Sequence, residues 1–376
     1  MFYACLPVAK VLCYIKTMKY LNAFNTIAGV GSQKLHLLMQ HFGSSEAAWQ
    51  ASATELVESG ISPALAEKIV IARREINPDA EWGKLVQHGI QTLAVTDIDY
   101  PALLKEISLP PYLLYVRGNS SFNTQPAIAV VGSRKFTSYG KQIASVFASD
   151  LVHAGVSVVS GLALGIDAIA HRGALDAGGH TIAVLGSSLE DSMIDPRENF
   201  NLSRDILHSG GALISEFPLG TSATPGTFPA RNRIMAGMTL GTLVVEAAIG
   251  SGSLITANLA VECNREVFAV PGSIFSPSST GTNSLIKSGA KMVTGVADIL
   301  GELRLPERAA AAHVRESIPA TPEEAKILNI LSTEPLQVDR IIKLSTLDTA
   351  RVGALLTIME MKGLVKNIGG HNYIKL

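Results

Sequence analysis

The sequence predicts an α/β protein built on a doubly wound, mostly parallel sheet, with a small helical module before it and a small helix-and-hairpin domain after it. Three observations carry this prediction. Short Val/Ile-rich runs alternate with helical stretches between residues 84 and 300, as in βαβ units whose strands are buried on both faces. The preceding segment has apolar residues at helical spacing, and the following one ends in a Gly-Gly hairpin pattern.

The bulk composition restricts the class of protein. The chain has 376 residues, of which 47% are apolar and 17% are charged, so it is long enough for two or three domains with a large buried core. No uncharged apolar run reaches the roughly 18 residues of a membrane span. The three cysteines stand at spacings unlike those of a disulfide framework or a zinc site. We expect a cytoplasmic protein with no membrane span, no metal and no cofactor.

The first residues differ in character from the rest of the N-terminal segment. Lys10 and Lys16 interrupt the apolar opening "MFYACLPVAKVLCYIK", and no small-residue cleavage site comes after it. Met18 begins a more ordinary N-terminus, "MKYLNAF", so an upstream start codon would explain the difference. Residues 1–17 are therefore expected to be an N-terminal extension, not a signal peptide.

Residues 18–83 are expected to form the helical module. An apolar stripe at i, i+3, i+4 and i+7 predicts an amphipathic helix there: Leu35, Leu38, Met39 and Phe42. A second helix is predicted to have Ser62 as its N-cap and Pro63 at its first position. Paired Gly turns between short helices resemble helix-hairpin-helix or sterile-alpha-motif-like modules. A small helical bundle used for packing or contacts is at least as open an interpretation.

Residues 84–300 are expected to form a Rossmann-like domain. Six continuous Val/Ile-rich runs predict its parallel strands: 127–131, 156–160, 181–185, 212–215, 242–246 and 266–270. The stretch before them predicts two further strands around a Pro-broken middle. Helical segments between the six runs predict right-handed crossovers in a doubly wound sheet.

Residues 301–319 have no packing signature and are expected to be a linker. Residues 320–376 predict a helix, a short helix, a longer helix and a hairpin with Gly369-Gly370 at its tip, the order of a winged helix-turn-helix. In the longer helix an apolar face, with Gly363 as the C-cap, is predicted: Val352, Leu355, Leu356 and Met359. Arg351 and Lys362 are its basic residues, and both DNA and protein remain open as its partner.

The carboxyl ends of the predicted strands are where a ligand is expected in such a sheet. Five of the six lead into Gly or Ser turns, among them Gly132-Ser133, Ser160-Gly161 with Gly165, and Gly186-Ser187. A nucleotide usually needs one or two such turns, so this edge suggests several consecutive phosphates. Because the formal net charge is only −1, any nucleic-acid site must be a local basic cluster.

Three clusters supply groups suited to a phosphate. Gly132, Ser133 and Arg134 offer close backbone approach, a hydroxyl and a bidentate cation beside a helix start. Ser251, Gly252 and Ser253 stand at another predicted helix N-terminus, where simple N-capping is the alternative.

Arg231, Asn232 and Arg233 lie just inside a Pro-started helix, where two cations are locally unfavourable unless an external anion offsets them. An internal salt bridge to Glu216 or Glu246 is the alternative for these arginines. Phe228 stands beside them and fits either a base-stacking or a core position.

Asp167 and His171 stand at i, i+4 on one predicted helix. They could perform acid–base chemistry, or His171 could donate to Asp167 and fix a loop. No Ser or Cys nucleophile stands at a matching spacing, and no carboxylate cluster suggests a metal. We expect no catalytic residues.

Several long stretches together resemble the DNA-processing protein A family, also called Smf or DprA. They run in order from about residue 85 to 300 and include "VVGSRKFTSYG", "VSGLALGIDAIAHRGAL", "TIAVLGSSLE", "ISEFPLG", "FPARNRIMAG", "LVVEAAIGSGSLITA" and "REVFAVPG". The resemblance implies a non-enzymatic protein that binds single-stranded DNA, protects incoming strands in natural transformation (competence) and loads the RecA recombinase in DNA recombination. It also implies a homodimer formed through the Rossmann-like domain.

The resemblance also implies which residues contact DNA phosphates: the Gly-Ser-Arg signature, the Arg-Asn-Arg run and the Ser-Gly-Ser loop. With the strand-end turns added, the predicted DNA-binding residues are Gly132, Ser133, Arg134, Ser160, Gly161, Gly165, Arg231, Asn232, Arg233, Ser251, Gly252 and Ser253. Leu164 and His180 stand where some members have basic residues, and Asp195 stands where a Tyr often precedes Pro196. Either the charge comes from elsewhere, or affinity is weaker and more pH-dependent.

The sequence leaves two other functions open. A nucleotide-processing enzyme of the N-glycosidase type could use Glu246 or Asp167, although the "PGGxGTxxE" stretch of such families is absent. An adaptor is the other, in which the end modules recruit partners and the central domain is a dimer scaffold.

Overall fold

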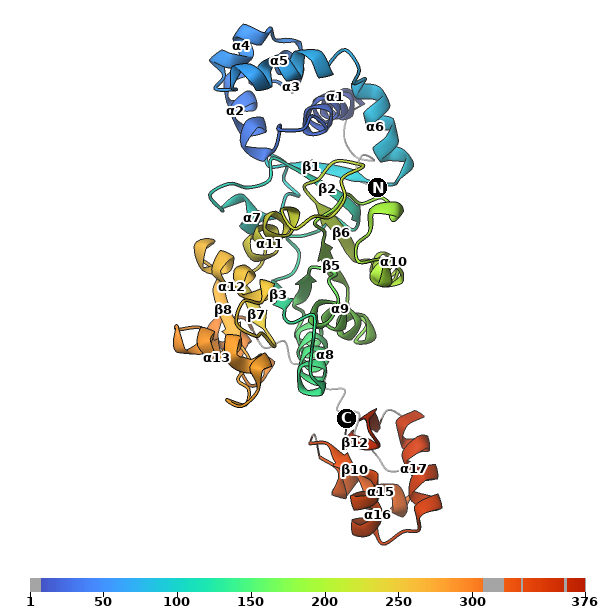
Figure 1. Cartoon of the computed structure of the whole chain (residues 1–376). Helices are drawn as coiled ribbons and strands as arrows, with labels where there is room; N and C mark the ends of the chain where they lie inside the picture. The colour runs from blue at the N-terminus through green and yellow to red at the C-terminus, as the bar shows by residue number, and fades with distance from the viewer. Residues whose placement is uncertain (1–7, 307–320, 333, 362–363, 376) are drawn as a thin grey trace. The chain divides into compact units, whose positions relative to one another are not determined.

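The computed structural model describes residues 8–306, 321–332, 334–361 and 364–375. It divides into two compact units, Met1–Arg308 and Ala309–Leu376 (Figure 1). No helix among the described residues is both long and apolar enough to cross a membrane. The predicted linker of residues 301–319 lies mostly outside the described part, and its first residues are not linker: Leu303 and Leu305 pack against the core of the first unit.

The first unit begins with the helical module, coloured blue in Figure 1. Its helices are α1 (Val8–Asn25), α2 (Ser32–Phe42), α3 (Ser45–Gln50), α4 (Ala53–Glu58), α5 (Pro63–Ala72) and α6 (Pro78–Gln87). Phe24 of α1 packs edge-on against Trp49 of α3, with ring centroids 4.9 Å apart. Ser62 and Pro63 take the N-cap and first helical positions of α5, as predicted.

The predicted boundary between residues 17 and 18 is wrong as a structural boundary. Helix α1 runs through Met18 without a break, and that side chain is buried. Upstream of it, Tyr14 Oη donates to the Thr92 carbonyl (3.0 Å) and to Asp97 Oδ2 (2.8 Å). Residues 1–7 of the predicted extension lie outside the described residues.

A nine-stranded sheet forms the centre of the first unit, in the order β1-β2-β6-β5-β4-β3-β7-β8-β9. The strands are β1 (Gln91–Ala94), β2 (Leu113–Gly118), β3 (Ala127–Val131), β4 (Ser157–Ser160), β5 (Thr181–Val184), β6 (Ala212–Ser215), β7 (Gly241–Val244), β8 (Glu266–Ala269) and β9 (Lys291–Met292). From β6 to β9 all neighbours are parallel, and β1 and β2 add an antiparallel edge. All eight predicted strands are present; β9, with two exposed residues, is not predicted.

Helices cover both faces of this sheet because alternate strand residues point to opposite sides. On one face Ile128 and Val130 of β3 join a core with α8 (Ser138–His153), α9 (Ile166–Asp176) and α14 (Val296–Glu302). On the other face Val131 joins a core with α7 (Ala102–Lys105), α11 (Thr227–Gly237) and α12 (Gly252–Glu262). The predicted doubly wound, mostly parallel fold is confirmed.

A third core cluster makes the helical module part of the first unit. It combines the module's apolar residues with Tyr115 of β2, Leu213 of β6 and α10 (Phe200–His208). Tyr115 Oη donates to Asn22 Oδ1 (2.8 Å) and accepts from Asn25 Nδ2 (3.1 Å). The buried tyrosine hydroxyl therefore has both a hydrogen-bond acceptor and a donor in the helical module.

The second unit contains α15 (Pro322–Ile330), β10 (Leu336–Gln337), α16 (Val338–Ser345), α17 (Thr349–Met361), β11 (Val365–Gly369) and β12 (Asn372–Lys375). Its antiparallel sheet has the order β10-β12-β11, and the predicted apolar face of α17 packs into its core. The predicted winged-helix arrangement is confirmed, with β10 as an additional strand. Exposed Arg351 is ion-paired to Glu323 (2.7 Å); Lys362 and Gly363 lie outside the described residues.

Candidate nucleic-acid interface

The order in which the chain adds strands to the sheet reverses between the neighbouring parallel strands β3 and β7. From β3 the strand order continues one way to β4, β5 and β6, and the other way to β7, β8 and β9. The carboxyl ends of strands at such a reversal leave a crevice for ligands. A cavity of about 730 Å³ opens there, lined by the turns after β3 and β7 and by the first residues of α11 and α12. Its volume lies within the usual range of ligand sites.

The turn after β3 is held by contacts inside the protein. Ser133 N donates to the Glu246 carbonyl (2.7 Å), and Ser133 Oγ donates to the Lys135 carbonyl (2.7 Å). A Cβ on Gly132 would lie 2.7 to 2.9 Å from Ile166 of α9, so packing alone requires this glycine. Arg134 is exposed and projects from the turn. Of the three predicted residues, Arg134 is therefore the one placed to meet a phosphate.

The carboxylate of Glu246 already binds the N-terminus of α8. Glu246 accepts hydrogen bonds from Thr137 N (2.9 Å) and Thr137 Oγ1 (2.7 Å), one on each carboxylate oxygen. Thr137 is the N-cap of α8 and its hydroxyl also accepts from Gly140 N (3.1 Å). A carboxylate at a helix N-terminus offsets the positive end of the helix dipole. The expectation that this helix start would attract the phosphate is therefore wrong.

The start of α12 differs, because the hydrogen bonds described at its N-terminus are made by serine hydroxyls and not by a carboxylate. Ser251 caps it, accepting from Ser253 N at 3.4 Å, and the two hydroxyls lie 2.8 Å apart. Ser251, Gly252 and Ser253 all line the cavity. N-capping is thus present, and the positive end of this helix still faces the cavity.

Arg231 lies at the base of the cavity, where its side chain is buried. Its guanidinium donates to the carbonyls of Gly161 and Val184, the latter at 2.7 Å, and Nε donates to Asn232 Oδ1 at 3.0 Å. The cation therefore bridges the carboxyl ends of β4 and β5. Burial lowers the pKa of Arg231, and the nearby charge of Arg134 lowers it further, whereas Asp167 raises it.

Asp167 and His171 do not meet. Asp167 Oδ2 accepts from Gly161 N (3.1 Å), and burial raises the pKa of this carboxyl although Arg231 opposes the shift. His171 Nδ1 lies 2.8 Å from Thr181 Oγ1, and that hydroxyl donates to the Val158 carbonyl (2.6 Å), so Nδ1 carries the proton. Burial lowers the pKa of His171 to about 3. The predicted possibility of an Asp167–His171 contact is therefore wrong.

The balance of charge in the cavity is positive. Arg134, Lys135 and Arg231 line it together with one carboxylate, Asp167. Within the described part of the chain, neither Arg134 nor Lys135 has a carboxylate within salt-bridge distance. Nor do the described residues contain a group of His, Cys, Asp or Glu that could hold a metal ion. An anionic ligand would match this arrangement.

Phe228 is a residue whose place the sequence left open. It is half-buried under Arg134, whose guanidinium carbon lies 5.4 Å from the ring centroid. The stacked pair separates the main cavity from a second one of about 60 Å³, lined in part by Leu164 and Asp195. Arg134 and Arg231 line both cavities, but the smaller one adds the carboxylate of Asp195 whereas the larger one adds Lys135 and Asp167. The excess of positive charge is therefore greater in the larger cavity.

The remaining predicted residues lie outside the larger cavity. Ser160 is buried and donates to the Val130 carbonyl (2.6 Å). Gly165 has φ +86°, and a Cβ there would collide with the Ser133 carbonyl and Arg134 Cα, so it allows the turn after β3 to pack on α9. Gly161 borders the smaller cavity. His180 lies at the opposite edge, before β5, where it lines a separate small pocket.

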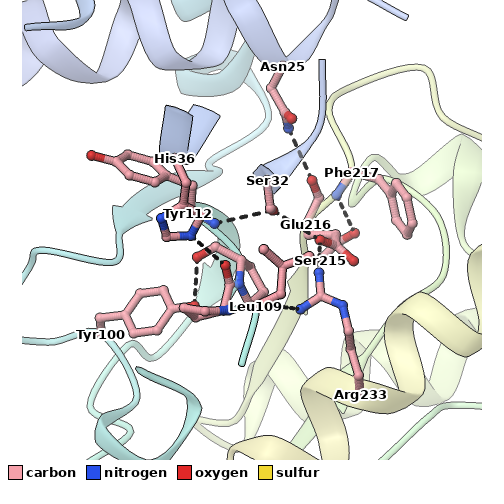
Figure 2. A network of polar contacts seen from close by, with 12 residues as sticks. Asn25, Ser32, His36, Tyr100, Leu109, Tyr112, Ser215, Glu216, Phe217 and Arg233 are labelled. Carbon is pink, nitrogen blue, oxygen red and sulfur yellow. Dashed lines mark hydrogen bonds and ion pairs between the residues drawn. The ribbon is translucent and has the colours of Figure 1, made fainter. Parts of the chain in front are cut away.

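Arg233 points away from the cavity into a second polar cluster, shown in Figure 2. Its guanidinium forms an ion pair with Glu216 and donates to the Leu109 carbonyl (2.8 Å). Ser32 of α2 lies within 3.4 Å of Glu216 Oε2, and Asn25 of α1 donates to the Glu216 carbonyl (3.1 Å). For Arg233 the alternative interpretation, an internal salt bridge, holds. We call these residues the Glu216 network.

Comparison with known proteins places these features in a family. Residues 91–304 match the family model described as DNA recombination-mediator protein A, and residues 309–371 match the DprA winged helix domain. The chain is 34% identical to "Protein Smf" of Synechocystis, in a match that covers 94% of this chain and 98% of that protein.

Two solved structures share the fold at similar levels of identity. DNA processing protein A of Streptococcus pneumoniae matches with a TM-score of 0.66 and 34% identity, over 76% of this chain and 97% of that one. DNA processing protein A of Helicobacter pylori, described for its single-stranded DNA binding mode, matches with a TM-score of 0.51 and 30% identity, over 57% of this chain and 95% of that one.

Proposed function

The chain belongs to the DNA recombination-mediator protein A family, and from this premise we propose that it binds single-stranded DNA in the cavity between β3 and β7. The DNA backbone enters beside Arg134 and Lys135, and the open N-terminus of α12 faces it from the other side. Binding is electrostatic in its main part and therefore weakens with salt. The protein acts as a binder and not as an enzyme.

The observation that carries this proposal is the unmatched charge of the cavity. Three basic side chains and one buried carboxylate line it, and exposed Arg134 stacks on Phe228 instead of pairing with an acid. A guanidinium can take two phosphate oxygens at once. The ring of Phe228 gives the same site an aromatic face for a base.

The carboxylates argue for binding over catalysis. An N-glycosidase would need Glu246 or Asp167 free to act on a substrate. Both oxygens of Glu246 accept hydrogen bonds from Thr137, and the buried carboxylate of Asp167 accepts one from Gly161 N. The groups on which the enzyme alternative depended therefore have structural roles that explain them.

Membership of the family supports a proposal for the wider role as well. We propose that the protein protects incoming single strands in the cytoplasm and helps to load the RecA recombinase on them, as a homodimer formed through the Rossmann-like domain. The description of the matching family as a recombination mediator supports the loading role. The winged-helix domain has a recognition-type helix whose Arg351 is already ion-paired, which favours a protein partner for that domain.

The test is the salt dependence of binding, measured by fluorescence anisotropy with labelled oligo-dT and a matched duplex. Wild type should prefer the single strand. Arg134→Ala should weaken binding and reduce the slope of log affinity against log salt by about 0.7, the value for one phosphate contact on a single strand. The matched control is Arg172→Ala, which removes an exposed arginine of α9 that is ion-paired to Asp205; its slope should stay near that of wild type.

Two results would contradict the proposal. If Arg134→Ala leaves the slope unchanged, the contact with phosphate is wrong. If neither DNA binds measurably at low salt, single-stranded DNA is not the ligand, and release of free base from a nucleoside monophosphate becomes the next assay.

A further inference from the structure

An apolar patch borders the cavity on the side of β7 and β8. Among the described residues the four most exposed large apolar side chains are Ile98 (91%), Phe275 (90%), Ile249 (80%) and Ile274 (80%). Ile249 lies in the loop between β7 and α12. Ile274 and Phe275 lie in the next loop along the sheet, between β8 and the short 3-10 helix Pro277–Ser279. We call Ile249, Ile274 and Phe275 the apolar rim.

The first loop is hydrogen-bonded to the start of α13 (Thr280–Lys287), the helix that comes after the second loop. Gly281 N donates to the Ala247 carbonyl (2.7 Å), and Ile249 N donates to Thr280 Oγ1 (3.3 Å). A Cβ on Gly281 would lie 2.6 Å from the Ala247 carbonyl oxygen, so the close approach of the first loop to α13 depends on that glycine. The backbone that carries Ile249 therefore has a defined position relative to α13.

The loop that carries Phe275 has its own internal bonds. Ser273 turns it, because its hydroxyl accepts from Phe275 N (3.3 Å) and its carbonyl accepts from Ser276 N (3.0 Å). Asn283 of α13 (Thr280–Lys287) exchanges two hydrogen bonds with the Gly272 backbone, at 3.2 and 3.0 Å. Phe275 is thus held out toward solvent on an ordered backbone, whereas a loop free to collapse would bury such a ring.

The apolar rim meets the cavity at Ile249, and the loop that carries its other two residues meets the cavity at its end. Ile249 itself lines the cavity, as do Pro277 and Ser278 at the end of the second loop. Neither loop contains a charged residue: the segments are "AAIGSGS" (247–253) and "PGSIFSPSS" (271–279). A phosphate would find no cation here, so the rim suits the uncharged part of a nucleotide.

We propose that the apolar rim is a base platform: bases of the strand lie on Phe275, Ile274 and Ile249 while its phosphates pass Arg134 in the cavity. This rests on the proposed binding of single-stranded DNA. Base–aromatic stacking is tolerant of sequence because every base has a π-face. The platform therefore lengthens the site along the strand without adding charge or sequence preference.

The test compares Phe275→Ala with Arg134→Ala over a series of oligo-dT lengths, measured by anisotropy. Phe275→Ala should weaken binding of long oligonucleotides by roughly fivefold to a hundredfold, the effect of losing one stacked base, with an unchanged salt slope. The loss should disappear for oligonucleotides too short to extend beyond the cavity. Arg134→Ala should reduce the salt slope at every length.

Three further variants make the result specific. Phe275→Trp keeps an aromatic face and should retain affinity, whereas Phe275→Leu keeps apolar character and should not. Ile98→Ala is the matched control, since Ile98 is as exposed as Phe275 but follows β1, at the far edge of the sheet. It should bind as wild type does. Because Phe275 is 90% exposed, its variants should melt at the wild-type temperature.

The outcomes separate this inference from the proposed function. If Phe275→Ala binds every length as wild type does while Arg134→Ala is weakened, the platform is wrong and the phosphate site stands. If Arg134→Ala has no effect, the phosphate site itself is wrong. If Phe275→Ala dissociates a dimer in sedimentation velocity without a length-dependent loss of DNA affinity, the rim contacts a second copy of the chain, and the base platform is overturned.

Discussion

Two arginines of α11, two positions apart, belong to two differently built regions. In the Glu216 network Arg233 has a carboxylate partner, and helices α1 and α2 supply further hydrogen bonds. In the cavity Arg231 contacts carbonyls, and its neighbour Arg134 has no acidic partner among the described residues. The first region balances its charge internally, whereas the described residues of the second leave two cations without a carboxylate partner. Unbalanced charge, more than the number of arginines, therefore distinguishes the proposed binding site.

The largest expected effect on stability comes from breaking the balanced region. Glu216→Ala leaves Arg233, whose side chain is only 19% exposed, without its carboxylate. Removing one member of a largely buried ion pair should lower the free energy of unfolding by about 3 kcal/mol, measured by urea denaturation. Asp205→Ala is the control, because both side chains of the Arg172–Asp205 pair are about half exposed and the loss should stay below about 1 kcal/mol. Equal losses in the two variants would contradict the difference between the two regions.

An intermediate effect is expected from crowding the base of the cavity. In Gly161→Ala the new Cβ would overlap the Arg231 guanidinium, so the side chain or the backbone must shift. Overpacking of this kind should cost about 2 kcal/mol and should weaken single-stranded DNA binding, because Arg231 moves with it. The control Gly83→Ala places a methyl group in open space on α6 and should stabilise by up to about 1 kcal/mol. Unchanged DNA affinity in Gly161→Ala would show that Arg231 does not contribute to the site.

The smallest expected effect is a change of pH dependence in the Glu216 network. Burial raises the pKa of Glu216 above its ordinary value of 4.5, although Arg233 opposes the shift. Between pH 4.5 and the raised pKa of Glu216 in the folded protein, the folded protein binds more protons than the unfolded chain. The free energy of unfolding therefore falls as the pH rises through this interval. Glu216→Gln does not titrate. The stability of wild type relative to this variant should therefore decrease from pH 4.5 upward, with a slope below about 1.4 kcal/mol per pH unit; an increase would contradict the assigned direction.

The sequence predicted the scaffold of the site well. The family resemblance, first seen in its motifs, is confirmed by the match over residues 91–304. Strands such as β3 and β6 begin and end where their Val/Ile-rich runs do, because a strand buried on both faces has a strong local pattern. Ser62 and Pro63 begin α5 for an equally local reason.

The orientation of side chains was harder to predict. Arg231, Asn232 and Arg233 look like one basic cluster in the sequence, but on a helix residues two apart point to nearly opposite sides. Helical periodicity alone would therefore have separated the two arginines. Glu246 is different, because its partner Thr137 lies 109 positions earlier. No local pattern contains such a contact, so the charge at the start of α8 could be assigned only from the fold.

The positions of the tryptophan side chains make intrinsic fluorescence a probe of one part of this chain. The protein has two tryptophans, Trp49 in α3 and Trp82 in α6, and both belong to the helical module. The cavity and the apolar rim contain none among their described residues. Intrinsic emission therefore reports on the helical module and not on a base stacked at Phe228 or Phe275. A shift in that emission when oligo-dT is added would therefore show that DNA binding in the cavity changes the environment of a tryptophan in the helical module, which the Glu216 network connects to the sheet.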